Sequence, residues 1–200
     1  PSLTSMMAAV QAPELPLAYL NFGGFGNTAG IIRSTRVNNV RDIRNIIFPN
    51  TSEYSADQSY QSQSDWDRIR DFHRLNMERL GQESGVLARN KNNRQFYLDA
   101  FGRAEGIKVF GDLIPDQNEI QQPRGAGKFG NSTLHQQIQV SLLAFKSGVS
   151  VAADVLEIGY DTHTYHERDH TPLLGNSTDA IDYLWTFAEE LGLADRLVVV

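Results

Sequence analysis

The 200-residue chain is long enough for one domain with a substantial hydrophobic core. Its formal net charge of −6 disfavours a general nucleic-acid-binding surface, because phosphate binding requires clustered Lys and Arg side chains. The sequence contains no cysteine, which excludes disulfides, thiolate metal sites and cysteine nucleophiles. No apolar run approaches the roughly 20 residues that are needed to span a bilayer, so we expect neither nucleic acid as a partner nor a membrane span.

The first predicted elements are a helix, a strand and a glycine-rich turn. Residues 2–11 carry apolar side chains at helical spacing, with Ser2 as the N-cap, and residues 17–22 form a short apolar strand. Glycines follow at 23–30 with a G-x-G-x-x-x-G spacing that only loosely resembles a dinucleotide-binding turn. We expect them to allow positive φ angles and close backbone packing. A nucleotide-cofactor enzyme that uses this turn is kept as an alternative, and it requires a helix beginning at 26–30.

Polar residues dominate the next segment. Residues 33–64 predict a long surface connection, or a short helix at 39–47 followed by a loop. Residues 65–80 predict an amphipathic helix with Asp65 as its cap, because apolar side chains recur at three- and four-residue steps. His73 of that helix is interpreted as a solvated histidine. The elements predicted beyond it are a helix at 95–104, an extended segment at 106–114 and a loop at 115–130.

The segment 133–146 is the clearest amphipathic helix of the chain. Its apolar side chains recur at i, i+4, i+8 and i+11, which places them in one stripe. Asn131 or Ser132 is the predicted cap, and Gly148 follows the end of the helix. His135 and the glutamines beside it face away from the apolar stripe.

The C-terminal part predicts a strand, a helix and a second strand. Residues 149–158 are rich in β-branched and apolar side chains, residues 176–191 have helical spacing, and residues 196–200 are an apolar strand. A strand–helix–strand crossover of this length is normally parallel and right-handed, so the predicted class is α/β. Because the last strand stops on an apolar run, we interpret residues 1–200 as an internal part of one domain of a longer protein.

A histidine-rich loop follows the predicted strand 149–158. Asp161 and His163 are two residues apart and lie on the same side of an extended segment, with His166 and His170 just beyond them. Ligands bind beyond the carboxyl ends of the strands in open α/β sheets. Carboxylate and imidazole suit Zn²⁺ or Mn²⁺, and the carboxylate also suits Mg²⁺ or Ca²⁺. We predict Asp161 and His163 as metal ligands, and His166 and His170 as further ligands or as supporting groups.

Two other interpretations of this loop remain open. It is a solvated surface feature if the short D-x-H string has no function. It serves metal-free acid–base chemistry if Asp161 polarises His163. No nucleophile with a local signature supports the latter, because the sequence lacks a G-x-S-x-G elbow and neither Ser150 nor Thr164 stands out.

The strings GYDTHTYHERDH and LGLADRLVVV, with the amphipathic helix between them, resemble the bacterial domain-of-unknown-function family 1501. The mark of that family is a G-[FWY]-D-T-H string after a strand, present here at 159–163. The segments PSLTSMMAAV, LNFGGFGNTAGIIRSTR and NIIFPN also look like it, so the resemblance covers nearly the whole chain. The family is a distant relative of the alkaline phosphatases and sulfatases. The resemblance therefore implies an alkaline-phosphatase-like sandwich, present in part, with a mostly parallel central sheet and helices on both faces.

The same resemblance implies a function. A metal-dependent hydrolase of phosphate or sulfate esters, of small molecules or polysaccharides, would use Asp161 and His163 as ligands of a divalent metal. The remaining ligands and the nucleophile would come from elsewhere, because a catalytic metal takes three or more protein ligands. Members of the family often look exported, which implies a periplasmic or secreted protein. The alternative is a non-catalytic exported protein that binds metal or polysaccharide.

Overall fold

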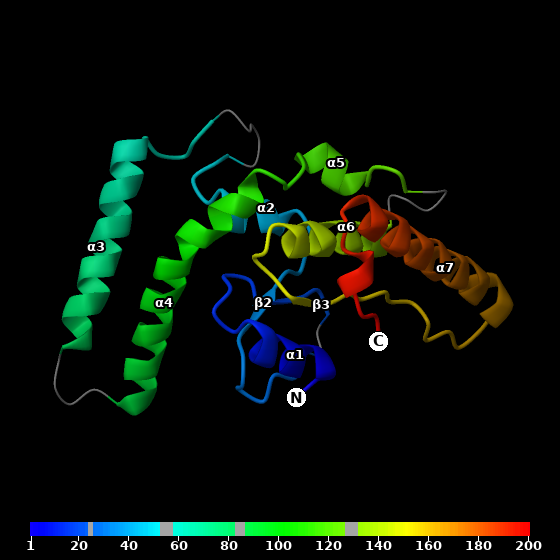
Figure 1. The fold of residues 1–200 in the computed structure, drawn as a ribbon, viewed down its shortest axis with the longest axis horizontal. Helices are drawn as coiled ribbons and strands as arrows, with labels where there is room; N and C mark the ends of the chain where they lie inside the picture. The colour runs from blue at the N-terminus through cyan, green and yellow to red at the C-terminus, as the bar shows by residue number, and fades with distance from the viewer. Residues whose placement is uncertain (24–25, 53–57, 83–86, 127–131) are drawn as a thin grey trace.

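The computed structural model describes residues 1–23, 26–52, 58–82, 87–126 and 132–200. It has a small sheet of parallel strands in the order β2-β1-β3 at the centre of an α/β fold. Helices lie on both faces of this sheet, with α1 on one side and α6 on the other (Figure 1). The predicted α/β class with a parallel sheet is therefore confirmed. The strands are β1 (Tyr19–Asn21), β2 (Ser34–Arg36) and β3 (Ala152–Asp154).

The two faces of β1 differ in character because successive side chains of a strand point to opposite sides. Leu20, paired with Thr35 and Ala153, faces the main hydrophobic core. Tyr19 packs instead with Ala8 of α1 (Leu3–Gln11), on the other side of the sheet. Ser2 caps α1 as predicted, since its hydroxyl accepts a hydrogen bond from the Ser5 N–H at 3.2 Å.

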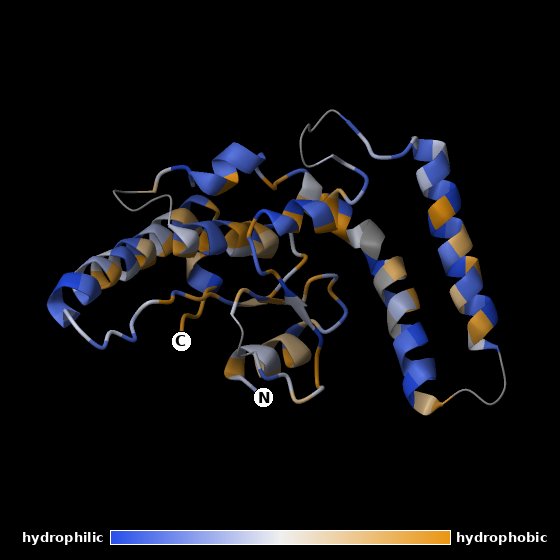
Figure 2. Ribbon diagram, turned by 180° about the vertical axis from the view of Figure 1, so that it is seen from behind, coloured by the Kyte–Doolittle hydropathy of each residue, from blue (hydrophilic) through white to orange (hydrophobic). Residues whose placement is uncertain are grey.

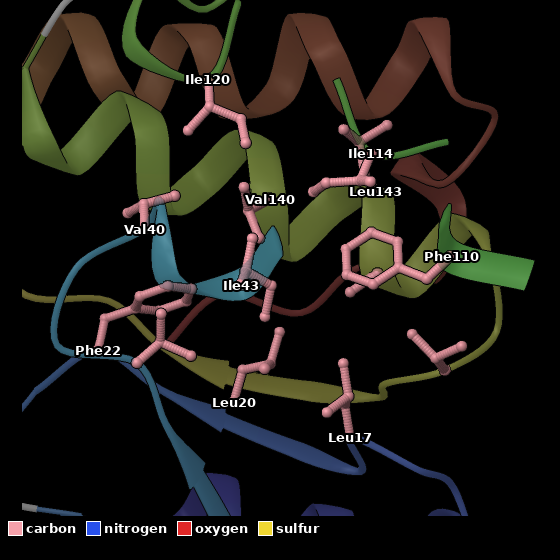
Figure 3. Close-up of a cluster of buried hydrophobic side chains, with 13 residues drawn as sticks. Leu17, Leu20, Phe22, Val40, Ile43, Phe110, Ile114, Ile120, Val140 and Leu143 are labelled. Carbon is pink, nitrogen blue, oxygen red and sulfur yellow. The ribbon is translucent and has the colours of Figure 1, made fainter. Parts of the chain in front are cut away.

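The main core fills the space between the sheet and the helices α2 (Asp42–Ile47), α4 (Ala88–Gly111), α5 (Gln117–Gln121) and α6 (Thr133–Lys146). Figure 3 shows side chains from the sheet side meeting side chains of these helices. The members are Leu17, Leu20, Phe22, Val37, Val40, Ile43, Phe110, Ile114, Ile120, Val140, Leu143, Ala144 and Val149.

Helix α6 occupies the predicted residues and has core on two sides. Ser132 is its cap, while Asn131, the alternative, lies outside the described residues. Ile138 and Leu142 belong to a second buried cluster with α7 (His166–Glu190). Because the sheet lies on one side of α6 and α7 on the other, polar side chains outside the apolar stripe are buried as well.

Several predicted boundaries are wrong in the middle of the chain. The strand β2 was not expected within 33–64, whereas the alternative of a short helix at 39–47 is confirmed by α2. Helix α3 (Gln63–Gly81) is capped by Ser62 rather than by Asp65. Helix α4 continues to Gly111 through the segment expected to be extended, because Phe110 on its last turn is fully buried in the main core. Helix α5 forms within the expected loop.

The C-terminal prediction is wrong in three places. Helix α7 begins ten residues before the predicted start at 176, at His166, and contains Pro172. The predicted strand at 196–200 is absent from this fully described segment: the 3₁₀ turn η1 (Ala194–Arg196) is followed by an exposed extended end, with Val200 88% exposed. Strand β3 is also shorter than the predicted 149–158.

The helices α3 and α4 form an antiparallel arm beside the α/β body (Figure 1). Figure 2 shows a mostly hydrophilic α3 with isolated hydrophobic turns. Over its described length α3 has no buried residue, and Phe72 is 68% exposed. Surface ion pairs run along it, such as Arg74 with Glu78 at 3.1 Å. Within the described residues, every helix is too short or too polar to cross a membrane.

Candidate metal centre

The segment that carries the predicted ligands is fixed to α6 where it leaves β3. The Leu156 N–H donates to Gln137 Oε1 at 2.6 Å, and Gln137 Nε2 donates to the Leu156 carbonyl oxygen at 3.1 Å. Gln137 is only 4% exposed, so this pair of hydrogen bonds satisfies a buried amide with a strand-like backbone. The chain therefore leaves the sheet in a defined direction.

A carboxylate then joins the loop to α7. Glu157 accepts a hydrogen bond from the Tyr160 hydroxyl at 2.9 Å. Asn176 Nδ2 and the Ser177 hydroxyl, both from α7, also donate to the Glu157 carboxylate. Hydrogen bonds to an ionised acceptor are stronger than neutral ones. Glu157 thus holds the loop against the middle of α7.

Asp161 and His163 project from this loop into solvent. Gly159, with a φ of 108°, turns the chain just before them. Asp161 Oδ1 lies 3.6 Å from His163 Nε2, and the two side chains are 89% and 86% exposed. The structure therefore brings the two predicted ligands together, as their spacing indicated, and leaves both open to solvent.

His166 and His170 lie on the first turns of α7. Their ring centroids are 3.8 Å apart, because residues four apart share one face of a helix. The Nε2–H of His170 donates to the Tyr160 carbonyl oxygen at 2.5 Å. His166 Nδ1 lies 2.9 Å from the Thr162 hydroxyl.

Helix α7 does not include His163. Tyr165, with a φ of 54°, is the N-cap residue just before the helix, so only His166 and His170 share a helical face. Asp161 with His163 and His166 with His170 are two neighbouring pairs. Among the described residues, no three His, Asp or Glu side chains form a preformed metal-binding group.

The hydrogen bond of His170 decides which nitrogen is available as a ligand. A metal-binding histidine usually donates its other ring N–H to a carbonyl or a carboxylate. Since Nε2 of His170 carries the proton that is donated to Tyr160, Nδ1 holds the lone pair in the neutral ring. His170, a secondary candidate in the sequence, is therefore the candidate whose ring orientation is best defined.

Glu167 is a candidate that our sequence interpretation missed. It lies between His166 and His170 and completes an H-E-x-x-H string on a helix, a pattern found in zinc hydrolases. In those sites the glutamate acts as a general base. Recognising helical spacing at 166–170 would have revealed it, but the prediction that the helix starts at 176 hid the pattern.

The glycine-rich turn does not support cofactor binding. No helix begins at residues 26–30, all of which are described; a short turn there leads into β2. Gly26 instead allows a close approach: a Cβ atom placed on it would lie 1.6 Å from Asn21 Nδ2. The expected close packing is confirmed at Gly26, while Gly24 lies outside the described residues.

Comparison of the chain with protein-family models, with curated proteins and with solved structures finds no match. The function is therefore inferred from the residues and their geometry.

Proposed function

We propose that this protein is a metal-dependent hydrolase of phosphate or sulfate esters, with its divalent metal held at the loop 161–170. The resemblance to the domain-of-unknown-function family 1501 supports this proposal, and with it a periplasmic or secreted location and an alkaline-phosphatase-like sandwich around the observed parallel sheet. The metal is Zn²⁺ or one of Mg²⁺, Ca²⁺ and Mn²⁺.

The observation that carries the proposal is the orientation of His170. Its Nε2–H is donated to a backbone carbonyl, as in most metal-binding histidines, and its ring lies 3.8 Å from that of His166. Asp161 and His163 stand on the same loop with their polar atoms 3.6 Å apart. A carboxylate and three imidazoles within ten residues fit a borderline cation such as Zn²⁺.

The residues of the loop have separate tasks under this proposal. Asp161 and His163 would hold the metal from the exposed side, and His166 and His170 would hold or flank it from α7. A bound divalent ion supplies Lewis-acid polarisation of an ester oxygen and offsets negative charge in the transition state. Glu167 would accept a proton from the attacking group, and Glu157 keeps the loop in position through its contacts with α7.

Metal content tests the proposal directly. The protein is incubated with zinc, desalted and analysed by mass spectrometry as wild type, Asp161→Ala/His163→Ala and His73→Ala. His73 is the matched control, because it is an exposed histidine on α3 with Asp71 two residues before it. We expect about one zinc per chain in the wild type and in His73→Ala, and a loss in the double variant. Equal zinc in all three proteins would contradict the assignment.

A non-catalytic binding protein is the second candidate, and the exposure of the loop favours it. Tyr165, on the same loop as the exposed Asp161 and His163, is 69% exposed, with the Arg168 guanidinium 4.4 Å from its ring centroid, so one aromatic face is left for a sugar ring to contact. Metal-loaded protein is tested for hydrolysis of p-nitrophenyl phosphate and p-nitrophenyl sulfate. Hydrolysis that is lost in the double variant supports the hydrolase. Retained metal without hydrolysis, together with polysaccharide binding that Tyr165→Ala weakens, supports the binding protein.

A further inference from the structure

A second group of chemically active side chains lies at the start of α6. The Ser132 hydroxyl caps this helix by accepting the His135 N–H at 3.3 Å. The same oxygen lies 2.6 Å from Nδ1 of the His135 ring. Serine also caps α1 and α3, and in α3 the Ser62 hydroxyl forms hydrogen bonds with Asp65 and Ser64. A short contact between the cap and an imidazole thus distinguishes Ser132.

A carboxylate lies on the other side of the imidazole. His135 Nε2 is 3.1 Å from Asp179 Oδ2, which belongs to α7. The His135 side chain is fully buried, and its ring packs against Tyr183 at a centroid distance of 5.4 Å. Packing on both helices therefore fixes the ring between the serine and the aspartate.

The proton positions follow from these partners. A carboxylate only accepts hydrogen bonds, so Nε2 of the neutral ring carries the proton and donates it to Asp179. Nδ1 is then the acceptor, and the Ser132 O–H donates to it. This is the protonation state in which an imidazole can take a proton from a serine while a carboxylate orients it.

We propose that Ser132, His135 and Asp179 form a nucleophilic relay that attacks carboxylic esters. Ser132 is the nucleophile, His135 is the general base, and Asp179 is a positioning residue that fixes the tautomer. Ser132 is partly exposed whereas His135 is buried, so the hydroxyl is the end of the relay that a substrate can reach. The two ring nitrogens are exchanged relative to the serine-protease arrangement, but each member keeps its role.

The reaction balances without a metal or a redox partner. Ser132 Oγ forms a bond to the carbonyl carbon while its proton passes to His135 Nδ1. Collapse of the tetrahedral intermediate breaks the bond to the leaving alcohol, which departs with that proton. Water then attacks the acyl-serine in the same way and releases the acid. The N–H groups of Thr133 and Leu134, on the first turn of α6, have by their position no acceptor within the helix and are suitable donors to the oxyanion.

A fluorophosphonate probe, applied in the presence of EDTA, tests this relay independently of the metal site. The probe forms a P–O bond to an activated serine and loses fluoride, and peptide mass spectrometry locates the adduct. We expect one adduct, on Ser132. Ser132→Asn should abolish it while preserving the helix, because asparagine is as good an N-cap as serine. Ser62→Ala, which alters an equivalent cap without a histidine, should leave labelling unchanged.

Asp179→Asn tests the relay without removing either reacting group. Asp179 is partly exposed, so we expect the variant to fold, with circular dichroism as the check. The labelling rate should fall about 10²-fold, since general-base catalysis contributes roughly 10²–10⁴-fold and depends on the tautomer. A wild type that is not labelled, an adduct that persists in Ser132→Asn, or an unchanged rate in Asp179→Asn would each overturn the proposal.

Discussion

Replacing Gly26 with alanine should destabilise the protein through a single steric conflict. A Cβ atom on Gly26 would lie 1.6 Å from Asn21 Nδ2 and 2.8 Å from the Tyr19 hydroxyl. Asn21 is 1% exposed, so its side chain has no free space into which to move. Its displacement would break the hydrogen bond of 3.3 Å from Asn21 Nδ2 to the Tyr19 hydroxyl, which itself donates to Asp154 of β3.

The expected cost combines overpacking and a lost hydrogen bond. Extra atoms in a packed core cost about 1–3 kcal/mol, and a buried hydrogen bond contributes about 1 kcal/mol. We therefore expect Gly26→Ala to lower the free energy of unfolding by about 2–4 kcal/mol. For a chain of this size, each kcal/mol corresponds to about 2–4 °C, so Tm should fall by about 4–16 °C.

Gly102→Ala is the matched control, because the same atom is added where space is open. No heavy atom lies within 4 Å of a Cβ placed on Gly102, in the interior of α4. Alanine is favoured over glycine in a helix by about 1 kcal/mol, so this variant should be more stable than the wild type. Urea and thermal unfolding followed by circular dichroism measure both. A Gly26→Ala protein as stable as the wild type would refute the steric reasoning.

Two further predictions concern α7. Burial, followed by the charges of Glu190 and Glu119, raises the pKa of the Tyr183 hydroxyl. The stabilising contribution of this group is therefore complete below about pH 10, the pKa of an unfolded tyrosine, and is lost as the pH rises toward the folded-state pKa. Tyr183→Phe should remove that loss of stability, which unfolding curves measured between pH 8 and about 11 will show. Glu157→Ala removes the acceptor of three hydrogen-bond donors from the loop and α7. The free energy of unfolding, measured by urea titration, should therefore fall by about 2–4 kcal/mol. An unchanged unfolding midpoint would show that Glu157 does not hold the loop.

Helix α6 could be predicted because its signals are local. Ser132 supplies the cap, the apolar stripe supplies the period, and Gly148, with a φ of 73°, follows the end. The surroundings of its polar face could not be predicted. His135 and Gln139 were expected to face away from the core, yet they are 0% and 2% exposed. Helices α5 and α7, which are distant in the sequence, pack against this polar face. The local sequence pattern of α6 does not indicate contacts with distant segments.

Strands were predicted less well because their formation depends on partners. The apolar run at 196–200 has strong β propensity, but without a neighbouring strand it remains an exposed end. Strand β2 has little apolar character of its own and forms because β1 offers it hydrogen bonds. In α4, the segment predicted to be extended from 106 is helical as far as Gly111, because burial of Phe110 outweighs the low helix propensity of Gly106.

The candidate metal centre was predictable only where its geometry depends on local spacing. The spacing of Asp161 and His163 indicated that they would meet, and they do. The relation of His166 to His170 depended on where α7 begins, and the predicted start at 176 left both histidines outside the helix. Pro172 lies inside α7, beyond its first turn, where a proline removes one i→i−4 hydrogen bond.

The arm formed by α3 and α4 has a consequence for how the molecule opens. Helix α4 ends in the main core at Phe110, whereas α3 buries no residue and packs mainly on α4. Local opening costs least where few apolar contacts must be broken. The backbone amides of α3 should therefore exchange with solvent through small, local fluctuations, while those of α6 exchange only when the whole domain unfolds. The protein thus combines a cooperative α/β unit with a helix that can detach from its partner without disturbing the sheet.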